Sequence, residues 1–435
     1  MASAPALFLR KRHIAATIAG NALEFYDFTT YAYFAVQIGA TFFPSHDHFF
    51  SLMAALITFG AGFIMRPIGG IVIGRYADRI GRKPAMLLSF ALMGAGVVAI
   101  AVTPSYASIG IAAPIIVVIV RLVQGFALGG DVGPTTAILM EAAPPNRRGL
   151  YGALQYSSQG LATLLAGIAG VVLASVLDAQ QLQSFGWRIA FGLGALVVPI
   201  GFFMRRQLPE TLHSEPHNDL PVHQDKPRRS LAYIGITGLG MIVGATVGFY
   251  VLAYMSTYAQ TVLHMKANVS FAATLLFGAV NIVFSALGGL ASDKWGRRSV
   301  MIWPRVVFIA ATYPAFLLIV ARPDAVTLLT ATGVLAVLSQ FGGAAALVAL
   351  AEAIPKHMRS TMLAAIYALG VAVFGGTTQG AITWLMHVTG DIYAPAYYLT
   401  AANIVCLIAM LLMDETAPVA IRHAQTAIPS ADLGV

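Results

Sequence analysis

The chain has 435 residues, of which 58% are hydrophobic and 10% are charged, with a mean hydropathy of +0.77 and a net charge of +8. A soluble globular domain has roughly 25% charged residues, so this composition offers too few polar groups for a water-facing surface. The composition therefore excludes the class of water-soluble proteins. The single cysteine, Cys406, excludes an internal disulfide framework and a cysteine-based metal cluster.

Apolar stretches long enough to cross a bilayer recur along the whole chain. A spanning helix needs about 20 apolar residues, because the hydrocarbon core is roughly 30 Å thick. The stretches lack the strict alternation of strands, and helices satisfy their own backbone hydrogen bonds in lipid. We therefore expect an all-α polytopic membrane protein. Its twelve transmembrane helices lie near 14–43, 52–76, 84–103, 108–140, 150–176, 187–204, 231–262, 269–291, 299–320, 325–353, 360–389 and 394–413.

The basic residues are placed unevenly. Of the 26 Lys and Arg, those outside the helices fall mainly in the termini and in the loops after the even-numbered helices, whereas Arg188, Lys266 and Arg322 lie in the opposite loops. By the positive-inside rule both termini are cytoplasmic. The basic balance thus reflects topology and predicts no nucleic-acid partner. The apolar run after residues 10–12 is too long for a signal peptide and is predicted to remain as the first helix.

The longest polar stretch, 205–230, follows the sixth helix and contains Pro, His and charges of both signs. We expect it to be a cytoplasmic linker whose histidines are solvated and bind no metal. It divides the chain into an N-terminal six-helix half (1–204) and a C-terminal six-helix half (231–414), with a cytoplasmic tail at 415–435.

The two halves share motifs at nearly one offset. Gly-Arg-Tyr-Ala-Asp-Arg-Ile-Gly-Arg-Lys at 74–83 corresponds to Gly-Leu-Ala-Ser-Asp-Lys-Trp-Gly-Arg-Arg at 289–298. Glu-Ala-Ala-Pro at 141–144, followed by Arg148, corresponds to Glu-Ala-Ile-Pro at 352–355, followed by Arg359. A repeat of six-helix halves predicts a binding site between them at the membrane midplane.

These motifs resemble the signature of the major facilitator superfamily. Within it, Gly-Asn-Ala-Leu-Glu-Phe-Tyr-Asp-Phe at 20–28 and the motifs at 62–70 and 121–133 resemble the metabolite:proton symporter branch, and above all bacterial citrate–proton symporters. The resemblance covers nearly the full length; one departure is Asp131, where many relatives carry Glu. It implies a monomeric carrier of the bacterial cytoplasmic (inner) membrane that works by alternating access.

Several ionisable residues lie inside the predicted helices, where a charge costs about 2.5–3.5 kcal/mol on insertion scales. They are Glu24, Asp27, Arg66, Arg121, Asp131 and Arg305. Asp27 and Arg121 lie at comparable depth, and the resemblance implies that such a pair couples protons. Burial favours the protonated carboxyl and a nearby guanidinium favours the charged one, so moving Arg121 toward an anionic substrate would let Asp27 take up a proton. The alternative is a fixed ion pair that only joins two helices.

The other charges leave more than one interpretation open. Glu24 shares a helix face with Asp27, so either acid could titrate. Arg66 and Asp131 are expected to pair, either as a permanent packing contact or as a moving gate. For Arg305 we favour a structural role against Asp293 or Glu352 over substrate contact. The repeated motifs predict an inner gate of weak, exposed pairs. Its members are Asp78, Arg82, Glu141, Arg148, Asp293, Arg297, Glu352 and Arg359.

Neutral polar residues within the helices are candidate substrate ligands. The resemblance implies that helices 1, 4, 7 and 10 line the cavity, and helix 5 contributes two further amides. With Arg121, the candidates are Asn21, Tyr26, Gln124, Gln155, Gln159, Tyr250, Tyr254 and Gln340. For many of them an interhelical hydrogen bond worth roughly 0.6 kcal/mol is an equally good explanation.

The sequence contains no nucleotide-binding loop, zinc-hydrolase motif or nucleophile elbow, so we expect neither an enzyme nor a bound cofactor or metal. The prediction is proton symport of a tri- or dicarboxylate, citrate-like, into the cell, with substrate anion, protons and lipid as partners. One alternative is symport of another metabolite, such as a dicarboxylate or a zwitterion like betaine or proline. A different class is a non-transporting membrane sensor on a carrier fold.

Overall fold

The computed structural model describes residues 11–80, 82–129, 139, 143–144, 146–206, 229–355 and 358–417. The helices of the first half are α1 Lys11–Tyr33, α2 Ala35–Phe42, α3 His48–Ile80, α4 Arg82–Val102, α5 Tyr106–Ile109, α6 Ala112–Leu128, α8 Arg148–Val176, α9 Ala179–Gln181, the π-helical turn η1 Leu182–Gly186 and α10 Trp187–Arg206. Those of the second half are α11 Leu231–Thr261, α12 Ala267–Trp295, α13 Arg297–Ala321, α14 Ala325–Ala353, α15 Arg359–Gly370, the π-helical turn η3 Val371–Gly375, α16 Gly376–Thr389 and α17 Ala394–Leu412.

Eight helical segments of the described residues are long and apolar enough to cross a membrane, counting α15–η3–α16 as one. The apolar helices Leu87–Val102 and Ala112–Leu128 are shorter. The remaining two, α1 and α10, complete the twelve predicted helices, and the fold class is confirmed. Helix α1 carries Glu24 and Asp27 in its interior, which lowers its mean hydropathy.

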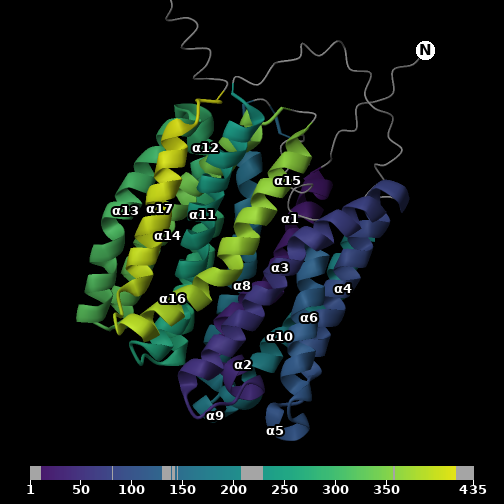
Figure 1. Ribbon diagram of the computed structural model, residues 1–435, viewed down its shortest axis with the longest axis vertical. Helices are drawn as coiled ribbons and strands as arrows, with labels where there is room; N and C mark the ends of the chain where they lie inside the picture. Colours follow the sequence, from purple (N-terminus) through teal and green to yellow (C-terminus); the bar gives the residue numbers. More distant parts are fainter. Residues whose placement is uncertain are drawn as a thin grey trace, which may run out of the picture.

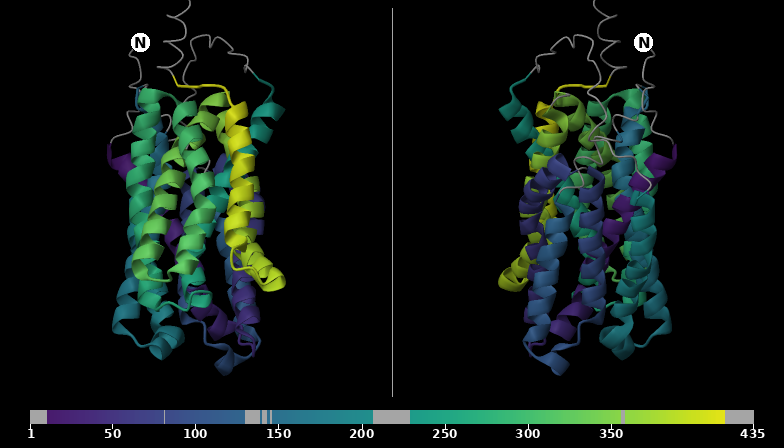
Figure 2. Two further views of the ribbon diagram at one scale, coloured as in Figure 1. Left: turned by 90° about the vertical axis from the view of Figure 1, so that its left-hand side faces the viewer. Right: turned by 90° about the vertical axis from the view of Figure 1, so that its right-hand side faces the viewer.

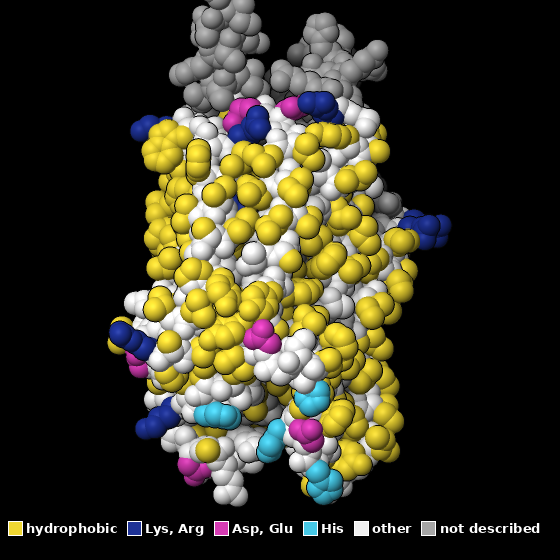
Figure 3. Space-filling view, turned by 60° about the vertical axis from the view of Figure 1, so that its left-hand side comes forward, with side chains coloured by type: hydrophobic (Ala, Val, Ile, Leu, Met, Phe, Trp, Pro, Cys, Tyr) yellow, Lys and Arg dark blue, Asp and Glu magenta, His cyan; other side chains and the backbone are white. Residues whose placement is uncertain are grey.

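The helices form two bundles that run along the long axis of the molecule (Figure 1). Helices α3, α4, α6 and α10 lie on the right of that view, and α11, α13, α14 and α17 lie on the left. Figure 2 shows the same arrangement from two sides. Hydrophobic side chains cover the broad middle of the face seen in Figure 3, and charged side chains gather mainly toward its two ends. This distribution fits a bilayer around the middle of the bundles.

Helix α3 shows how the sequence separates lipid-facing from interior positions. Ile57, Ile64 and Ile71 recur at seven-residue spacing and are 56–67% exposed, as expected of side chains that face lipid. Phe63 and Arg66, on the opposite face, are 0% and 4% exposed. An apolar stripe therefore faces the bilayer while a cation is directed into the protein.

Small residues bring the two halves together. Helix α8 packs along α12, and a Cβ at Gly149 would overlap the backbone oxygen of Gly289. Helix α3 packs on η3 and α16, where a Cβ at Gly60 would overlap the backbone oxygen of Gly376. Close backbone approach of this kind requires glycine. These two contact lines are where the halves meet on either side of the centre.

Candidate functional site

An ion pair lies at the centre of the first half. The Nη1 atom of Arg121 on α6 donates to Oδ2 of Asp27 on α1 at 2.8 Å, and the two side chains are 0% and 1% exposed. The structure therefore brings together the two residues that were predicted to pair. The Gln124 side chain, one turn further along α6, lies beside the same carboxylate.

Aromatic rings lie against the guanidinium of Arg121. The guanidinium carbon of Arg121 lies 3.9 Å from the centroid of the Tyr31 ring and 5.4 Å from that of Phe28. Such cation–π contacts contribute about 2 kcal/mol or more when the cation is desolvated. They hold Arg121 in the membrane interior with one carboxylate as its ionic partner among the described residues.

A cavity reaches the acids from the side of α4 and α10. It has a volume of about 20 Å³ and is lined by Leu23, Glu24, Tyr26, Asp27, Phe90, Met93, Gly94, Val97 and Gly194. A water needs roughly 10–15 Å³, so one molecule fits here. Glu24 and Asp27 thus face a shared space, as their three-residue spacing predicted.

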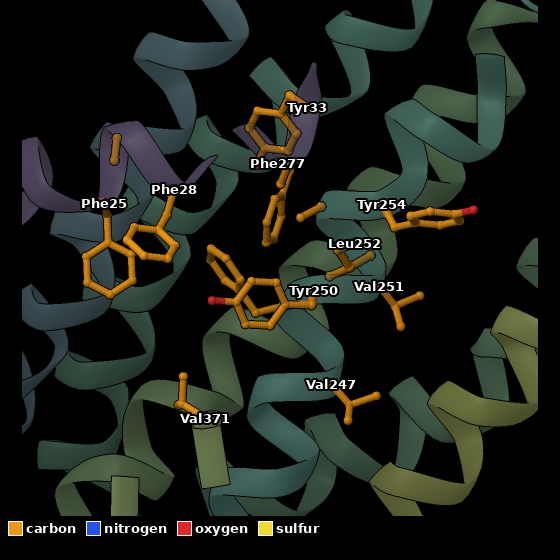
Figure 4. Packing of buried hydrophobic residues seen from close by; sticks show 14 of the residues in the cluster. Phe25, Phe28, Tyr33, Val247, Tyr250, Val251, Leu252, Tyr254, Phe277 and Val371 are labelled. Carbon is orange, nitrogen blue, oxygen red and sulfur yellow. The ribbon is translucent and has the colours of Figure 1, made fainter. Parts of the chain in front are cut away.

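Arg66 on α3 also lies against the Phe28 ring. Its guanidinium carbon is 4.7 Å from the Phe28 centroid and 4.0 Å from the Phe63 centroid. Tyr250 of α11 and Tyr367 of α15, both in the second half, lie close enough to act on it electrostatically, and so does Glu24. Figure 4 shows the Tyr250 hydroxyl directed toward Phe25 and Phe28 of α1. Arg66 is therefore at the junction of the two halves.

Helix α8 supplies a row of amides to this junction. Asn21 donates to Ser158 Oγ at 2.5 Å, and Gln155 donates to Asn21 Oδ1 at 3.3 Å. Gln159 Nε2 donates across the halves to the Tyr367 hydroxyl at 3.4 Å. Asn21 and Gln155 are thus bonded to each other, while Gln159, one turn further along α8, is bonded to the second half; we call these three residues the polar strip. Ser158 and Tyr367 accept from the strip but were not singled out by sequence, since a lone Ser or Tyr in an apolar helix gives little signal.

Other candidates point elsewhere in this conformation. The Tyr26 hydroxyl donates to the Ala190 carbonyl of α10 at 2.9 Å. The Tyr254 hydroxyl lies 2.7 Å from Thr383 Oγ1 of α16 and points away from the Tyr250 hydroxyl (Figure 4). Gln340 is buried on α14. Although the two tyrosines are four residues apart on α11, Tyr250 is directed toward the first half and Tyr254 into the second.

The second copy of the repeated motif forms a compact charge cluster, which we call the Arg297 network. Arg297 donates to Glu352 through Nε and Nη2, both at 3.1 Å, and to Asp293 through Nη1 at 2.9 Å. The Arg297 side chain is 0% exposed and the two acids are 7% and 9% exposed. The expectation of weak, exposed pairs is wrong here, because the guanidinium is enclosed between α12, α13 and α14.

Asp293 also joins the two halves. Its Oδ1 and Oδ2 atoms accept from the backbone amides of Gly149 and Leu150 at 2.8 and 3.1 Å. These amides open α8 directly after Arg148, and a carboxylate is favoured at a helix N-terminus. The network is thus fastened to the first half at this end of the molecule.

Two residues beyond the last helix complete the network. Glu415 accepts from the backbone amides of Arg297 and Arg298 at 2.9 and 3.0 Å, and the Thr416 hydroxyl donates to Glu352 at 2.8 Å. Neither residue was predicted to have a role, because an acid after a final helix has the pattern of an ordinary tail. A carboxylate that caps a helix from a distant segment leaves no local pattern.

The partner of Arg305 differs from the predicted one. Its Nη1 atom donates to Asn403 Oδ1 of α17, whereas Asp293 and Glu352 are held by Arg297. The prediction of an Arg305 pair with either acid is wrong; an amide one helix away takes that place. Asp131 and Glu141 lie outside the described residues, as do the side chains of Asp78, Arg82 and Arg359. The expected Arg66–Asp131 pair is among these.

The fold and the buried groups define a class: a two-bundle helical membrane protein with an ion pair in the core of one bundle and a polar junction between the two. The chain belongs to the major facilitator superfamily, whose family model matches residues 17–280. A second model, described as sugar (and other) transporter, matches residues 228–427.

Curated relatives and solved structures agree with this membership. A citrate-proton symporter of Klebsiella pneumoniae is 36% identical over 409 residues, which span 93% of this chain and 92% of the relative. A proline/betaine transporter of Escherichia coli (strain K12) is 31% identical over 424 residues, or 94% of this chain and 84% of that protein. The xylose transporter XylE from E. coli, in a partially occluded inward open conformation, superposes with a TM-score of 0.73 at 18% identity, covering 93% of this chain and 97% of XylE.

Proposed function

We propose that this protein is a transporter, not an enzyme, that imports a tri- or dicarboxylate such as citrate together with protons. The buried Asp27–Arg121 pair carries the proposal, because an acid held at full burial by one movable cation can change its protonation when that cation is drawn away. The similarity to citrate-proton symporters along nearly the whole chain supports the substrate class.

Coupling follows from competition for Arg121. While Arg121 is bonded to Asp27, the carboxylate is favoured in its charged form. A substrate carboxylate near the junction attracts the guanidinium, which can grip it through two parallel N–H groups. Asp27 then takes up a proton, because a buried carboxyl without its counter-charge favours the neutral form. Substrate and proton are thereby bound in the same step.

The cavity beside Glu24 and Asp27 supports a route for that proton. One water in this space would contact both acids, so Glu24 can relay a proton to Asp27 without passing the substrate. Asp131 remains a proposed coupling acid on the basis of its motif alone.

The energetics require such coupling. Moving one negative charge into a cell against 100 mV costs roughly 2.3 kcal/mol, so import of a multiply charged anion needs co-transported cations. We place the substrate between Arg121 and the polar strip of Asn21, Gln155 and Gln159, with Tyr26, Gln124, Tyr250, Tyr254 and Gln340 as further candidate ligands that reorient as the halves move.

The setting follows from the same proposal. We place the protein in the bacterial inner membrane as a monomer, with both termini and the 205–230 linker on the cytoplasmic side. In this orientation the Arg297 network lies at the inner end, where it closes the carrier by joining Asp293 to α8.

A zwitterion such as betaine or proline is the second candidate substrate. Proline/betaine transporters are 30–31% identical to this chain, and the Phe28, Phe63 and Tyr250 rings lie around one point of the junction. Aromatic faces of this kind suit a quaternary ammonium group. That point already holds the Arg66 cation, which disfavours a second cation and leaves the carboxylate as the better fit.

The test is uptake of labelled citrate into proteoliposomes under an inward proton gradient, with and without an uncoupler, repeated for Asp27→Asn. We expect uncoupler-sensitive accumulation in the unaltered protein. In Asp27→Asn it should fall to the uncoupled level while citrate counterflow persists. Accumulation that survives the substitution would move coupling to Glu24 or Asp131. Flux of betaine or proline in place of citrate would overturn the substrate, and no saturable flux of any of them would favour a sensor.

A further inference from the structure

Arg66 is a buried cation with an unused binding edge. Its side chain is 4% exposed, and its Nε and Nη2 atoms make no hydrogen bond among the residues that the structure describes. No carboxylate of those residues lies within ion-pair distance of it. A charge inside a membrane protein normally pairs or lines a site, so this cation calls for a partner.

The two unused atoms define what the partner can be. Nε and Nη2 carry the parallel N–H groups on one edge of the guanidinium, which is the fork that receives both oxygens of a carboxylate. At Arg297 the same two atoms hold Glu352 in this way, at 3.1 Å each. The Arg66 fork is intact and buried, so a carboxylate from outside the chain would satisfy it.

The surroundings of Arg66 belong to both halves. Phe28 and Phe63 of the first half lie against its guanidinium, and Tyr250 and Tyr367 of the second half lie beside it. A Cβ at Gly375 would meet both the Tyr250 and the Phe63 rings, so the π-helical turn η3 closes this place from the second half. Single π turns within α-helices are frequent at functional sites. A ligand on Arg66 would therefore sense the relative position of the halves.

Arg66 and Arg121 both lie against one ring. Their guanidinium carbons are 4.7 and 5.4 Å from the Phe28 centroid, so two cations share this ring in the core of the first half. Arg121 already has a carboxylate partner in Asp27, and Arg305, whose Nε and Nη2 atoms also make no hydrogen bond among the described residues, is held through Nη1 by Asn403 of α17. Arg66 is thus better placed than either of them to receive a substrate carboxylate in this conformation.

We infer that Arg66 binds a carboxylate group of the transported anion and helps select substrates by their number of carboxylates, a role that rests on the proposed function. Arg66 was expected to be part of a gate with Asp131. As a substrate ligand it contributes affinity in the loaded carrier, and its contact with the same Phe28 ring keeps it near Arg121. Anions that have one carboxylate for Arg66 and another for Arg121 therefore bind more tightly than anions with a single carboxylate.

The experiment measures binding of citrate, glutarate and butyrate, which carry three, two and one carboxylates, to the purified full-length protein, together with uptake into proteoliposomes. The variants are Arg66→Lys and Arg66→Gln, with Arg305→Lys as the matched change at a buried arginine that is bonded to Asn403 of α17. We expect Arg66→Gln to weaken binding of citrate and glutarate, which have a carboxylate for each cation, by about 10- to 100-fold, the range for losing hydrogen bonds to a charged partner. Binding of butyrate, with one carboxylate, should fall less, so the preference for anions with more than one carboxylate shrinks. Arg66→Lys retains the charge without the fork and should lie between, whereas Arg305→Lys leaves the preference unchanged.

The outcomes separate this inference from the function on which it rests. If the unaltered protein binds neither citrate nor glutarate, the proposed substrate class is wrong. If it binds them and the Arg66 variants show the same affinities and the same preference, Arg66 is no ligand and the inference is overturned. A fall in maximal uptake with KM and preference unchanged would assign Arg66 to a gate instead. Should Arg66→Gln not fold, the preference measured in Arg66→Lys decides the matter.

Discussion

The two halves hold their buried charges in different places. In the first half Asp27, Arg66 and Arg121 lie within the membrane-spanning part of α1, α3 and α6. In the second half the acids Asp293 and Glu352 gather on Arg297 at the ends of α12, α13 and α14. A repeated architecture thus carries unequal chemistry. The first half holds an ion pair and a further cation where a substrate and protons would meet; the second holds its ion pairs where the halves are fastened together, and its buried Arg305, farther along α13, is held by Asn403.

Hydrogen bonding differs in the same way. In the Arg297 network every nitrogen of the guanidinium is engaged, by two acids and by Ser292. In the first half the Nε and Nη2 atoms of both Arg66 and Arg121 remain without a partner among the described residues. A satisfied buried network rigidifies its surroundings, and an incompletely satisfied one is open to a ligand or to rearrangement. The buried arginines of the first half can therefore change partners, whereas the Arg297 network is suited to holding the helices in place.

The largest effect on stability is expected when Arg121 in the first half is removed. Arg121→Gln leaves Asp27 buried without its cation, and breaking a buried pair in this way costs about 3–5 kcal/mol. The double variant Asp27→Asn/Arg121→Gln removes both charges and should recover at least half of that loss. Unfolding of the purified protein in mixed micelles of rising SDS content measures both. Equal destabilisation by the single and double variants would show that the pair contributes through packing and not through charge.

A smaller effect is expected at the Arg297 network. Glu352→Gln keeps the shape of the side chain but removes one of two charged partners of Arg297, which should cost about 1.5–3 kcal/mol. Because this site lies away from Asp27, uncoupler-sensitive uptake should persist at the same ratio of protons to substrate. Proton and substrate fluxes measured together in proteoliposomes provide the check. A changed ratio would place the network within the coupling machinery and break the contrast between the halves.

Sequence predicted the fold well because bilayer thickness imposes a length on every apolar stretch. The twelve predicted ranges and the family were obtained from that constraint and from motifs such as 74–83. Sequence also predicted that Asp27 and Arg121 would meet, since two opposite charges at one depth have few other ways to be accommodated.

Contacts made by distant segments could not be predicted in the same way. Nothing near Arg305 indicates that Asn403 rather than Glu352 will accept from it, because that choice depends on how α13 rotates against α17. The cover of Arg66 by Tyr250 and Tyr367 likewise depends on how the halves dock. The capping of α13 by Glu415 joins residues far apart in the chain, and no spacing rule applies to it.

The smallest effect is expected at Glu415, which caps α13 beside the Arg297 network. Glu415→Ala removes the acceptor for the backbone amides of Arg297 and Arg298, as loss of a helix cap would, and should cost about 1 kcal/mol. The neighbouring Asp414→Ala is the matched control, because its pair with Arg229 is 41–53% exposed and such surface pairs contribute little. The same unfolding assay in mixed micelles compares them. Since the cap holds α13 beside the point where Asp293 binds α8, Glu415→Ala should also raise the rate of citrate counterflow slightly, by easing separation of the halves. If both variants lowered the free energy of unfolding equally, the tail would act only through its negative charge. Glu415 would then not belong to the Arg297 network.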